Sequence, residues 1–264
     1  MTTGTAAVRW AADLADWAIP EHILQRAPDD PHRFSVERFT ELAAEALRQP
    51  PTRTHERARA VLPDGGDVLD IGCGGGAASL PLAPPAGRLM GVDQSAGMLA
   101  AFARAATQRG VEAQTVEGTW PAVARAAPVA DVVVCAHVVY NVGDLVPFVQ
   151  ALSDRARHRV VLELPVRHPL AWLAPYWRAF HDIDRPHGPT ADDALTVLRD
   201  MGLHPRDDRW MRPNSLHRAP MDARVEFLRK RLALGADRDD DLRTMIDRIG
   251  VPAEREVVTA WWDV

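Results

Sequence analysis

The chain has 264 residues, of which 47% are hydrophobic, and its formal net charge at pH 7 is −5. This length and hydrophobic content are enough for one large domain with a sizeable core, which disfavours an intrinsically disordered chain. Acidic and basic residues are mixed along the sequence and no basic face stands out. We therefore expect no nucleic-acid partner, because phosphate binding needs such a face.

Cysteine and hydropathy patterns indicate the compartment. Cys73 and Cys135 provide no disulfide framework, and no run reaches the roughly 18 apolar residues of a membrane span. Charged residues at positions 9, 13 and 16 interrupt the first apolar stretch, so no signal peptide is indicated. We expect a cytoplasmic protein without a membrane partner. Lys230 is the only lysine, an arginine bias typical of a GC-rich bacterial genome.

The N-terminal part of the chain predicts three helices. Apolar residues recur at helical spacing over residues 6–19, 34–47 and 54–62. Ser35 is a plausible N-cap of the second helix. We expect these helices to pack beside the open end of the sheet that follows, with residues 1–54 forming an N-terminal helical cap.

From residue 67 onward, strands and helices alternate. Strands are predicted near 67–71, 88–92, 112–116, 131–135 and 159–164, with helices near 96–109 and 145–156. This alternation predicts an α/β fold, a doubly wound, mostly parallel sheet with right-handed crossovers. A further helix is predicted to open at Ala77 and to be shortened by the prolines at 81, 84 and 85.

The C-terminal third completes a seven-stranded sheet. A capping box beginning at Thr190 predicts a helix to about Met201, and residues 206–210 predict the sixth strand. Residues 256–262 predict a closing edge strand. Two helices, 221–234 and 239–249, form an insertion within residues 213–250 before this last strand, and residues 165–190 read as a lid-like segment.

The glycine-rich stretch after the first predicted strand is the most informative motif. Glycines at positions 72, 74, 75 and 76 expose bare main chain to a ligand at the carboxyl end of that strand. Asp93 follows the second strand, about 20 residues later, and suits a pair of ribose hydroxyls. Asp70 would repel a phosphate but stabilise an ammonium. The residues predict a ribose-bearing ligand that is cationic at one end.

These segments resemble the motifs of class I S-adenosylmethionine-dependent methyltransferases, and the resemblance extends over roughly residues 55–210. Residues 70–76 resemble the first motif of that family, and residues 91–95 with Met98 resemble the second. Residues 116–121 resemble its adenine-contacting loop, and residues 130–137 its fourth strand and active-site loop. The resemblance implies a Rossmann-like methyltransferase domain over residues 55–264.

The same resemblance implies S-adenosylmethionine as cofactor and a small organic molecule as methyl acceptor, at oxygen, nitrogen or carbon. Thr119 departs from the family, which commonly has Asp at that position. The cofactor-binding residues it implies are Asp70, Gly72, Cys73, Gly74, Gly76, Asp93, Gln94, Met98, Glu117, Gly118, Thr119, Trp120 and Ala136.

His137 and Tyr140, in the loop after the fourth strand, are the catalytic candidates. His137 suits a general base or a substrate hydrogen bond, but a histidine that only fixes the loop fits equally well. Tyr140 suits a wall of the methyl channel. The substrate-binding candidates are Tyr140, His168, Trp172, Tyr176 and His181. Core packing of the aromatic members of this set is the competing interpretation.

Several alternatives stay open at this level. The pattern Gly72-x-Gly74-x-x-Ala77 also satisfies the loose dinucleotide fingerprint of nicotinamide-dependent oxidoreductases. A methyltransferase-fold protein that binds without transferring a methyl group is a second alternative, and an RNA or protein acceptor has less support. We expect a monomer or homodimer. No metal site is expected, because the spacing of His181, Asp182 and His187 matches no ligand pattern.

Overall fold

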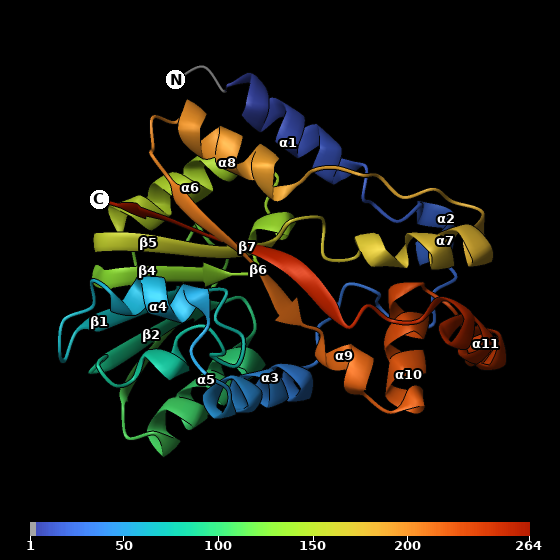
Figure 1. Ribbon diagram of the computed structural model, residues 1–264, viewed down its shortest axis with the longest axis horizontal. Helices are drawn as coiled ribbons and strands as arrows, with labels where there is room; N and C mark the ends of the chain where they lie inside the picture. The colour runs from blue at the N-terminus through green and yellow to red at the C-terminus, as the bar shows by residue number, and fades with distance from the viewer. Residues whose placement is uncertain (1–3) are drawn as a thin grey trace.

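The computed structural model describes residues 4–264 and shows an α/β fold built on one seven-stranded sheet (Figure 1). The strand order is β3-β2-β1-β4-β5-β7-β6. Among these strands only β7 runs antiparallel to its neighbours, which confirms the predicted mostly parallel sheet. The strands are β1 (Asp67–Ile71), β2 (Arg88–Asp93), β3 (Glu112–Glu117), β4 (Ala130–Ala136), β5 (Ala156–Pro165), β6 (Arg206–Pro213) and β7 (Glu254–Asp263).

The last strand is not the edge strand that residues 256–262 were predicted to form. β7 pairs with β5 on one side and with β6 on the other, so β6 is the edge. The residues from Val257 to Trp262 are all buried, whereas exposed and half-buried residues alternate through most of β6. A strand inside the sheet pairs along both edges, and the two cores on opposite faces of the sheet bury its continuous apolar run.

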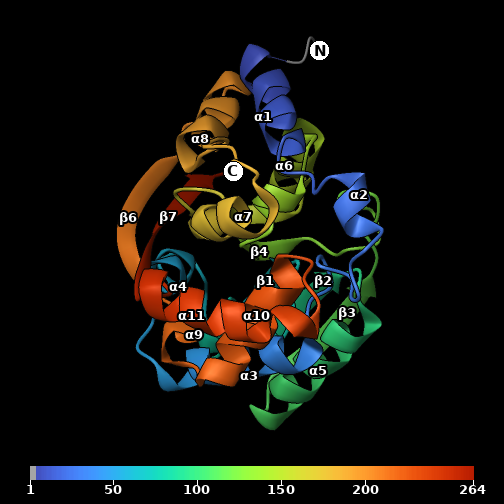
Figure 2. The ribbon, with the colours of Figure 1, turned by 90° about the vertical axis from the view of Figure 1, so that its right-hand side faces the viewer.

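Helices cover both faces of the sheet, as a doubly wound fold requires. On one face, α1 packs against α6 and α8. On the other, α5 packs on β2 and β3, α3 packs on α5, and α4 packs on β5 and β7. Figure 2 views the molecule from the side. The bounds are α1 (Thr5–Ala15), α3 (Val36–Arg48), α4 (Arg53–Arg59), α5 (Ala96–Gln108), α6 (Leu145–Asp154) and α8 (Ala191–Asp200).

Local capping signals act as the sequence predicted. The hydroxyl of Ser35 accepts a hydrogen bond from the backbone N–H of Arg38 at 3.1 Å, and Thr190 forms a capping box with Asp193. The N-terminal helices, however, only partly gather at the open end of the sheet. Because α1 and α4 find apolar partners on opposite faces, only α3 and the short helix α2 (Glu21–Leu24) lie near that end.

The helix predicted to open at Ala77 does not form. Turns follow the glycines, and the only helical element there is the three-residue 3-10 helix η1 (Leu80–Leu82). Pro81 lies inside it and Pro84 and Pro85 follow, and prolines remove donors and clash within a helix. The glycine turn therefore offers a ligand its own peptide groups and not the first turn of an α-helix.

A third, smaller hydrophobic cluster lies apart from the two that pack on the sheet. It joins α2 to α7 (Ala174–His181), α10 (Met221–Arg231) and α11 (Asp239–Ile249). Together with α9 (Ser215–Arg218), α10 and α11 form the predicted helical insertion between β6 and β7. Figures 1 and 2 show this group at the end of the molecule toward which β4 points. Within residues 4–264, no helix has the length and apolar character that crossing a bilayer demands.

Candidate functional site

The glycine turn after β1 adopts backbone angles that favour glycine. Gly72, Gly74 and Gly76 have φ values of +68°, +49° and +91°. A Cβ atom on Gly74 would lie 2.6 Å from the ring of Phe39 in α3, and one on Gly75 would collide with the Phe39 backbone. The missing side chains thus let α3 cover the turn, in addition to exposing main chain.

Asp93 joins the end of β2 to this turn. Its Oδ2 accepts a hydrogen bond from the backbone N–H of Gly74 at 3.0 Å, and its Oδ1 accepts one from the N–H of Ser95 at 2.9 Å. The side chain is half-buried. A carboxylate has about four lone-pair sites, so each oxygen can accept a further hydrogen bond. Asp93 is therefore held by the protein and still able to bind two hydroxyls.

Asp70 lies beneath the same turn. Its side chain is buried and its Oδ2 accepts one hydrogen bond, from the hydroxyl of Ser79 at 2.6 Å. Burial raises the pKa of Asp70 to about 7, the Ser79 hydrogen bond opposes the rise, and the negative charge of Asp93 adds to it. A buried carboxyl with one partner is a group that an approaching cation stabilises in its charged form.

The residues predicted to surround an adenine divide between surface and core. Gln94, Glu117 and Thr119 are exposed, and Gly118 is joined to β2 by a hydrogen bond from its N–H to the Asp93 carbonyl at 3.0 Å. Trp120 is buried, and its Nε1–H donates to the carbonyl of Phe148 at 3.2 Å.

Three further predicted cofactor residues line the strands and α5. Met98 is buried in α5, and Ala136 is half-buried at the end of β4. Cys73 is buried beside Gly91. A Cβ atom added to Gly91 would lie 2.8 Å from the Sγ of Cys73. Burial raises the pKa of the Cys73 thiol, so this side chain fills space and stays protonated.

His137 is the first residue after β4 and has a left-handed backbone, with φ of +62°. Its backbone N–H donates to the carbonyl of Glu163 at 2.7 Å, and its Nε2 lies 2.8 Å from the Glu163 Oε1. The next residue, Val138, packs closely on Gly72, and a Cβ atom added to Gly72 would collide with the Val138 side chain. The His137 loop and the glycine turn are therefore neighbours.

The imidazole of His137 is neutral at pH 7. Burial lowers its pKa to about 4; the hydrogen bond with Glu163 opposes this effect, and the charge of Arg255 strengthens it. Because a carboxylate only accepts, Nε2 carries the hydrogen and Nδ1 carries the lone pair. Both ring nitrogens are shielded from solvent and neither makes a well-aligned hydrogen bond within residues 4–264, so the 2.8 Å contact of Nε2 with Glu163 is what assigns the hydrogen to Nε2.

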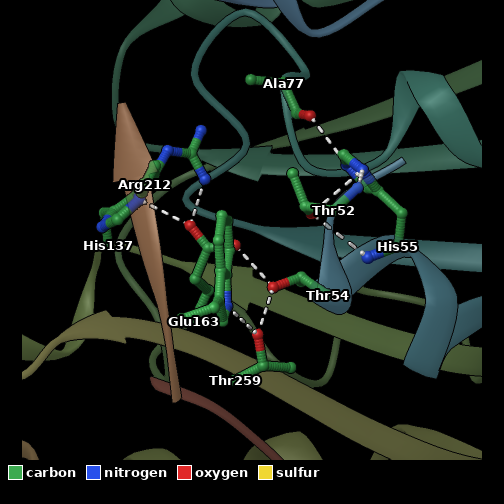
Figure 3. Close-up of polar contacts among 9 residues, drawn as sticks. Thr52, Thr54, His55, Ala77, His137, Glu163, Arg212 and Thr259 are labelled. Carbon is green, nitrogen blue, oxygen red and sulfur yellow. Dashed lines mark hydrogen bonds and ion pairs between the residues drawn. The ribbon is translucent and has the colours of Figure 1, made fainter. Parts of the chain in front are cut away.

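Glu163 is the centre of a buried polar network that the sequence reasoning missed. It lies on β5, and its Oε2 accepts a hydrogen bond from the hydroxyl of Thr54 at 2.5 Å, while Arg212 pairs with Oε1 (Figure 3). Thr259 lies 2.8 Å from the Thr54 hydroxyl. Burial favours the protonated acid, but the charge of Arg212 and the hydrogen bonds hold the pKa of Glu163 well below its usual range. The available signal was a lone acid in the apolar run of residues 160–165, since a buried charge needs a partner.

The two tyrosines among the predicted substrate residues lie in hydrophobic cores. Tyr140 packs on Trp10, and its hydroxyl donates to the Pro165 carbonyl at 2.8 Å. Tyr176 is fully buried, and its hydroxyl donates to the Gly250 carbonyl at 2.9 Å. Burial raises the pKa of both phenols. Both side chains therefore hold segments together, and their substrate roles stay predictions.

The other three predicted substrate residues lie along the segment after β5 and are not gathered at one point. His168 stacks on Trp17 with ring centroids 3.7 Å apart, and burial lowers its pKa to about 3. Trp172 stacks on Phe227 of α10. His181 Nε2 lies 2.7 Å from the Leu232 carbonyl. These contacts tie the segment to the turn after α1 and to α10 with the residue that follows it, and the substrate roles are again predictions.

Two surface cavities lie at the opposite end of the sheet. One is lined by residues around Gly202 and Trp262, and the other by residues around Ala83 and Arg109. Both are at the amino ends of parallel strands, and neither borders the glycine turn or His137. The candidate site is thus defined by its residues at the carboxyl ends of the strands, where α/β sheets bind ligands.

Comparison with known proteins agrees with this geometry. Residues 68–158 match the family described as "Methyltransferase domain". A curated relative, a ubiquinone biosynthesis O-methyltransferase of Ruegeria pomeroyi, is 31% identical over 152 residues, which cover 53% of this chain and 60% of that protein. The chain therefore spans less than two thirds of the length of this relative.

Solved structures share the fold at low identity. The YcgJ protein of Bacillus subtilis has a TM-score of 0.55 and is 18% identical, with 83% of this chain and 98% of that chain covered. Magnesium protoporphyrin IX methyltransferase of Synechocystis PCC 6803, with bound SAH, has a TM-score of 0.52 and is 14% identical, with 97% and 95% covered.

The strand order and the turn at the end of β1 define a nucleotide-binding α/β fold with an antiparallel strand inserted beside the edge strand. Dinucleotide-binding sheets instead have six parallel strands in the order 3-2-1-4-5-6, so the nicotinamide alternative is not favoured. Together with the match of residues 68–158 to a methyltransferase domain, this strand order agrees with the predicted resemblance to class I S-adenosylmethionine-dependent methyltransferases.

Proposed function

We propose that this chain is an S-adenosylmethionine-dependent methyltransferase that acts on a small organic acceptor. The observation that best supports the proposal is Asp93, which is hydrogen-bonded to the glycine turn directly above the buried Asp70. One acid suits the ribose hydroxyls and the other suits the ammonium of the same cofactor. The methyltransferase-domain match spans both residues.

The residues present fit this cofactor. Gly72, Gly74 and Gly76 would approach its amino-acid end, and Gln94 with Met98 would flank the adenine. The same resemblance assigns Cys73, Glu117, Gly118, Thr119, Trp120 and Ala136 to its surroundings. When bound, S-adenosylmethionine supplies a methyl group already activated on a sulfonium, so what the protein contributes is chiefly position and exclusion of water.

His137 has the protonation state of a proton acceptor. With Nε2–H beside Glu163, the lone pair on Nδ1 can take the proton that an acceptor hydroxyl releases as its oxygen gains the methyl group, once binding opens the surroundings that shield Nδ1 in the free protein. Glu163 then faces an imidazolium that it stabilises, so it acts as a positioning residue. Since the curated relative is named as an O-methyltransferase, we propose oxygen as the methylated atom. Tyr140 is given no proton role, because its hydroxyl is bound to Pro165.

The remaining parts of the proposal are a cytoplasmic location, a monomer or homodimer, and a small molecule, not a nucleic acid, as acceptor. The net charge of −5 supports the last part, because a nucleic-acid site needs a basic face.

Calorimetric titration with S-adenosylhomocysteine and with NADH tests the cofactor assignment. We expect S-adenosylhomocysteine to bind and Asp93→Asn to weaken it about 10- to 100-fold, because hydrogen bonds to a charged group contribute about 1.5–3 kcal/mol. Asp64→Asn, at an exposed loop acid before β1, is the matched control and should bind as the wild type does. Preferential binding of NADH, or equal affinity in the Asp93 variant, would contradict the assignment.

A further inference from the structure

Two arginines lie directly opposite each other at the end of the candidate site. Arg212 on β6 is the register partner of Arg255 on β7. Arg212 pairs with Glu163, but the guanidinium of Arg255 makes no hydrogen bond or ion pair with any of residues 4–264, and its Nε is shielded from solvent. Like charges directly opposite on paired strands destabilise a sheet, and a partly buried charge without a partner adds to that cost.

The charges around Arg255 do not balance. With His137 neutral, two guanidiniums face the one carboxylate of Glu163. The nearest acid on the same face of β6, Asp208, is already bound to Arg57 at 2.6 Å. Glu254 and Glu256 are exposed and alternate with Arg255 along β7, so their side chains point to the other face. The cluster therefore has one positive charge in excess.

Arg255 also lies beside the proposed proton acceptor. Its positive charge contributes to the lowered pKa of His137, and burial lowers its own pKa to about 10, so it stays charged at pH 7. The cluster extends along the carboxyl ends of β4, β5 and β6 and the amino end of the antiparallel β7, on the side of His137 away from the glycine turn. An acceptor and the cofactor would thus approach His137 from different sides.

We propose that Arg255, with Arg212 beside it, binds a carboxylate of the methyl acceptor next to His137. The acceptor class is then a small hydroxylated carboxylic acid, whose hydroxyl lies beside His137 while its carboxylate neutralises the excess positive charge. A guanidinium matches a carboxylate with two parallel hydrogen bonds, which orients the acceptor as well as holding it. The inference rests on the proposed function and adds the substrate class.

The two possible roles of Arg255 predict opposite effects on stability. An arginine that only supports the fold would destabilise the protein when replaced. Replacing an arginine that is left unpaired so that it can bind a ligand would instead stabilise the free protein, because the repulsion from Arg212 is removed. We therefore expect Arg255→Gln to raise the Tm of the free protein while it weakens binding of a carboxylate.

The test uses benzoate as the probe and benzamide as its neutral analogue, titrated by calorimetry with and without S-adenosylhomocysteine. We expect benzoate to bind the wild type, to bind Arg255→Gln at least tenfold more weakly, and benzamide not to bind. Arg206→Gln is the matched control, since Arg206 lies on the same face at the other end of β6 and pairs with Asp263. It should bind benzoate as the wild type does.

Three results would overturn the proposal: equal benzoate affinity in the wild type and Arg255→Gln, no benzoate binding to the wild type, or a lower Tm in Arg255→Gln. The titrations with S-adenosylhomocysteine distinguish failure of this proposal from failure of the proposed function. If S-adenosylhomocysteine binds and benzoate does not, the carboxylate site alone is wrong. If benzoate binding depends on Arg255 while S-adenosylhomocysteine fails to bind, the carboxylate site stands and the methyltransferase proposal does not.

Discussion

Replacing Glu163 with glutamine tests whether one buried carboxylate holds the end of the sheet together. The change keeps the shape of the side chain and removes its charge, so Arg212 loses its counterion and the acceptor facing His137 becomes neutral. Removing one partner of a buried ion pair costs about 3–5 kcal/mol. The Arg212 side chain is 26% exposed, which makes about 3 kcal/mol the better estimate, since water screens part of its charge.

This loss should be measurable in two independent ways. For a chain of this size, about 3 kcal/mol corresponds to a fall in Tm of roughly 6 °C or more, seen by calorimetry at pH 7. The pKa of His137, followed by NMR, should fall further, because the carboxylate of Glu163 is what raises it. Glu256→Gln, at an exposed acid on β7, is the control and should change stability by less than about 0.5 kcal/mol.

A free energy of unfolding for Glu163→Gln within about 1 kcal/mol of the wild-type value would contradict this prediction, since breaking a buried ion pair should cost more. The prediction is also refuted if the pKa of His137 rises in the variant, because the hydrogen bond to Glu163 would then not be what opposes the effect of burial.

Two further predictions concern the loop and the turn. Because folding lowers the pKa of His137 from about 6.5 to about 4, the unfolded chain binds a proton there that the folded chain does not. The contribution of His137 to stability should therefore fall by about 3 kcal/mol as pH drops through that window, against an opposite contribution from Asp70, whose pKa folding raises. His137→Asn, which tolerates the positive φ, should lose less over the same range in urea unfolding; an unchanged pH dependence would contradict this. Gly74→Ala places a methyl group 2.6 Å from the Phe39 ring and should destabilise by about 1–3 kcal/mol in the same assay. Gly143→Ala, which meets no atom within 4 Å, is its control, and equal losses in both would show that the contact is not the cause.

The elements themselves could be predicted from the sequence because their signals are local. Burial along a strand, the cap at Ser35 and the capping box at Thr190 each depend on a few consecutive residues. The glycine turn and Asp93 could be predicted as well, since their types and spacing already define the kind of ligand they suit. The prediction of a helix from Ala77 was wrong because three nearby prolines prevent the helix that usually follows such a glycine turn.

The tertiary structure alone decided which distant residues meet. That residues 256–262 form an inner strand depends on pairing with β6, a contact no local pattern specifies. The network of Glu163, Thr54 and Arg212 joins residues 49 and 109 positions apart. The sequence determined the resemblance to methyltransferases and the predicted cofactor residues, because these reside in short motifs. The charges around His137 depended on the fold, because electrostatic partners are set by distance in space and not along the chain.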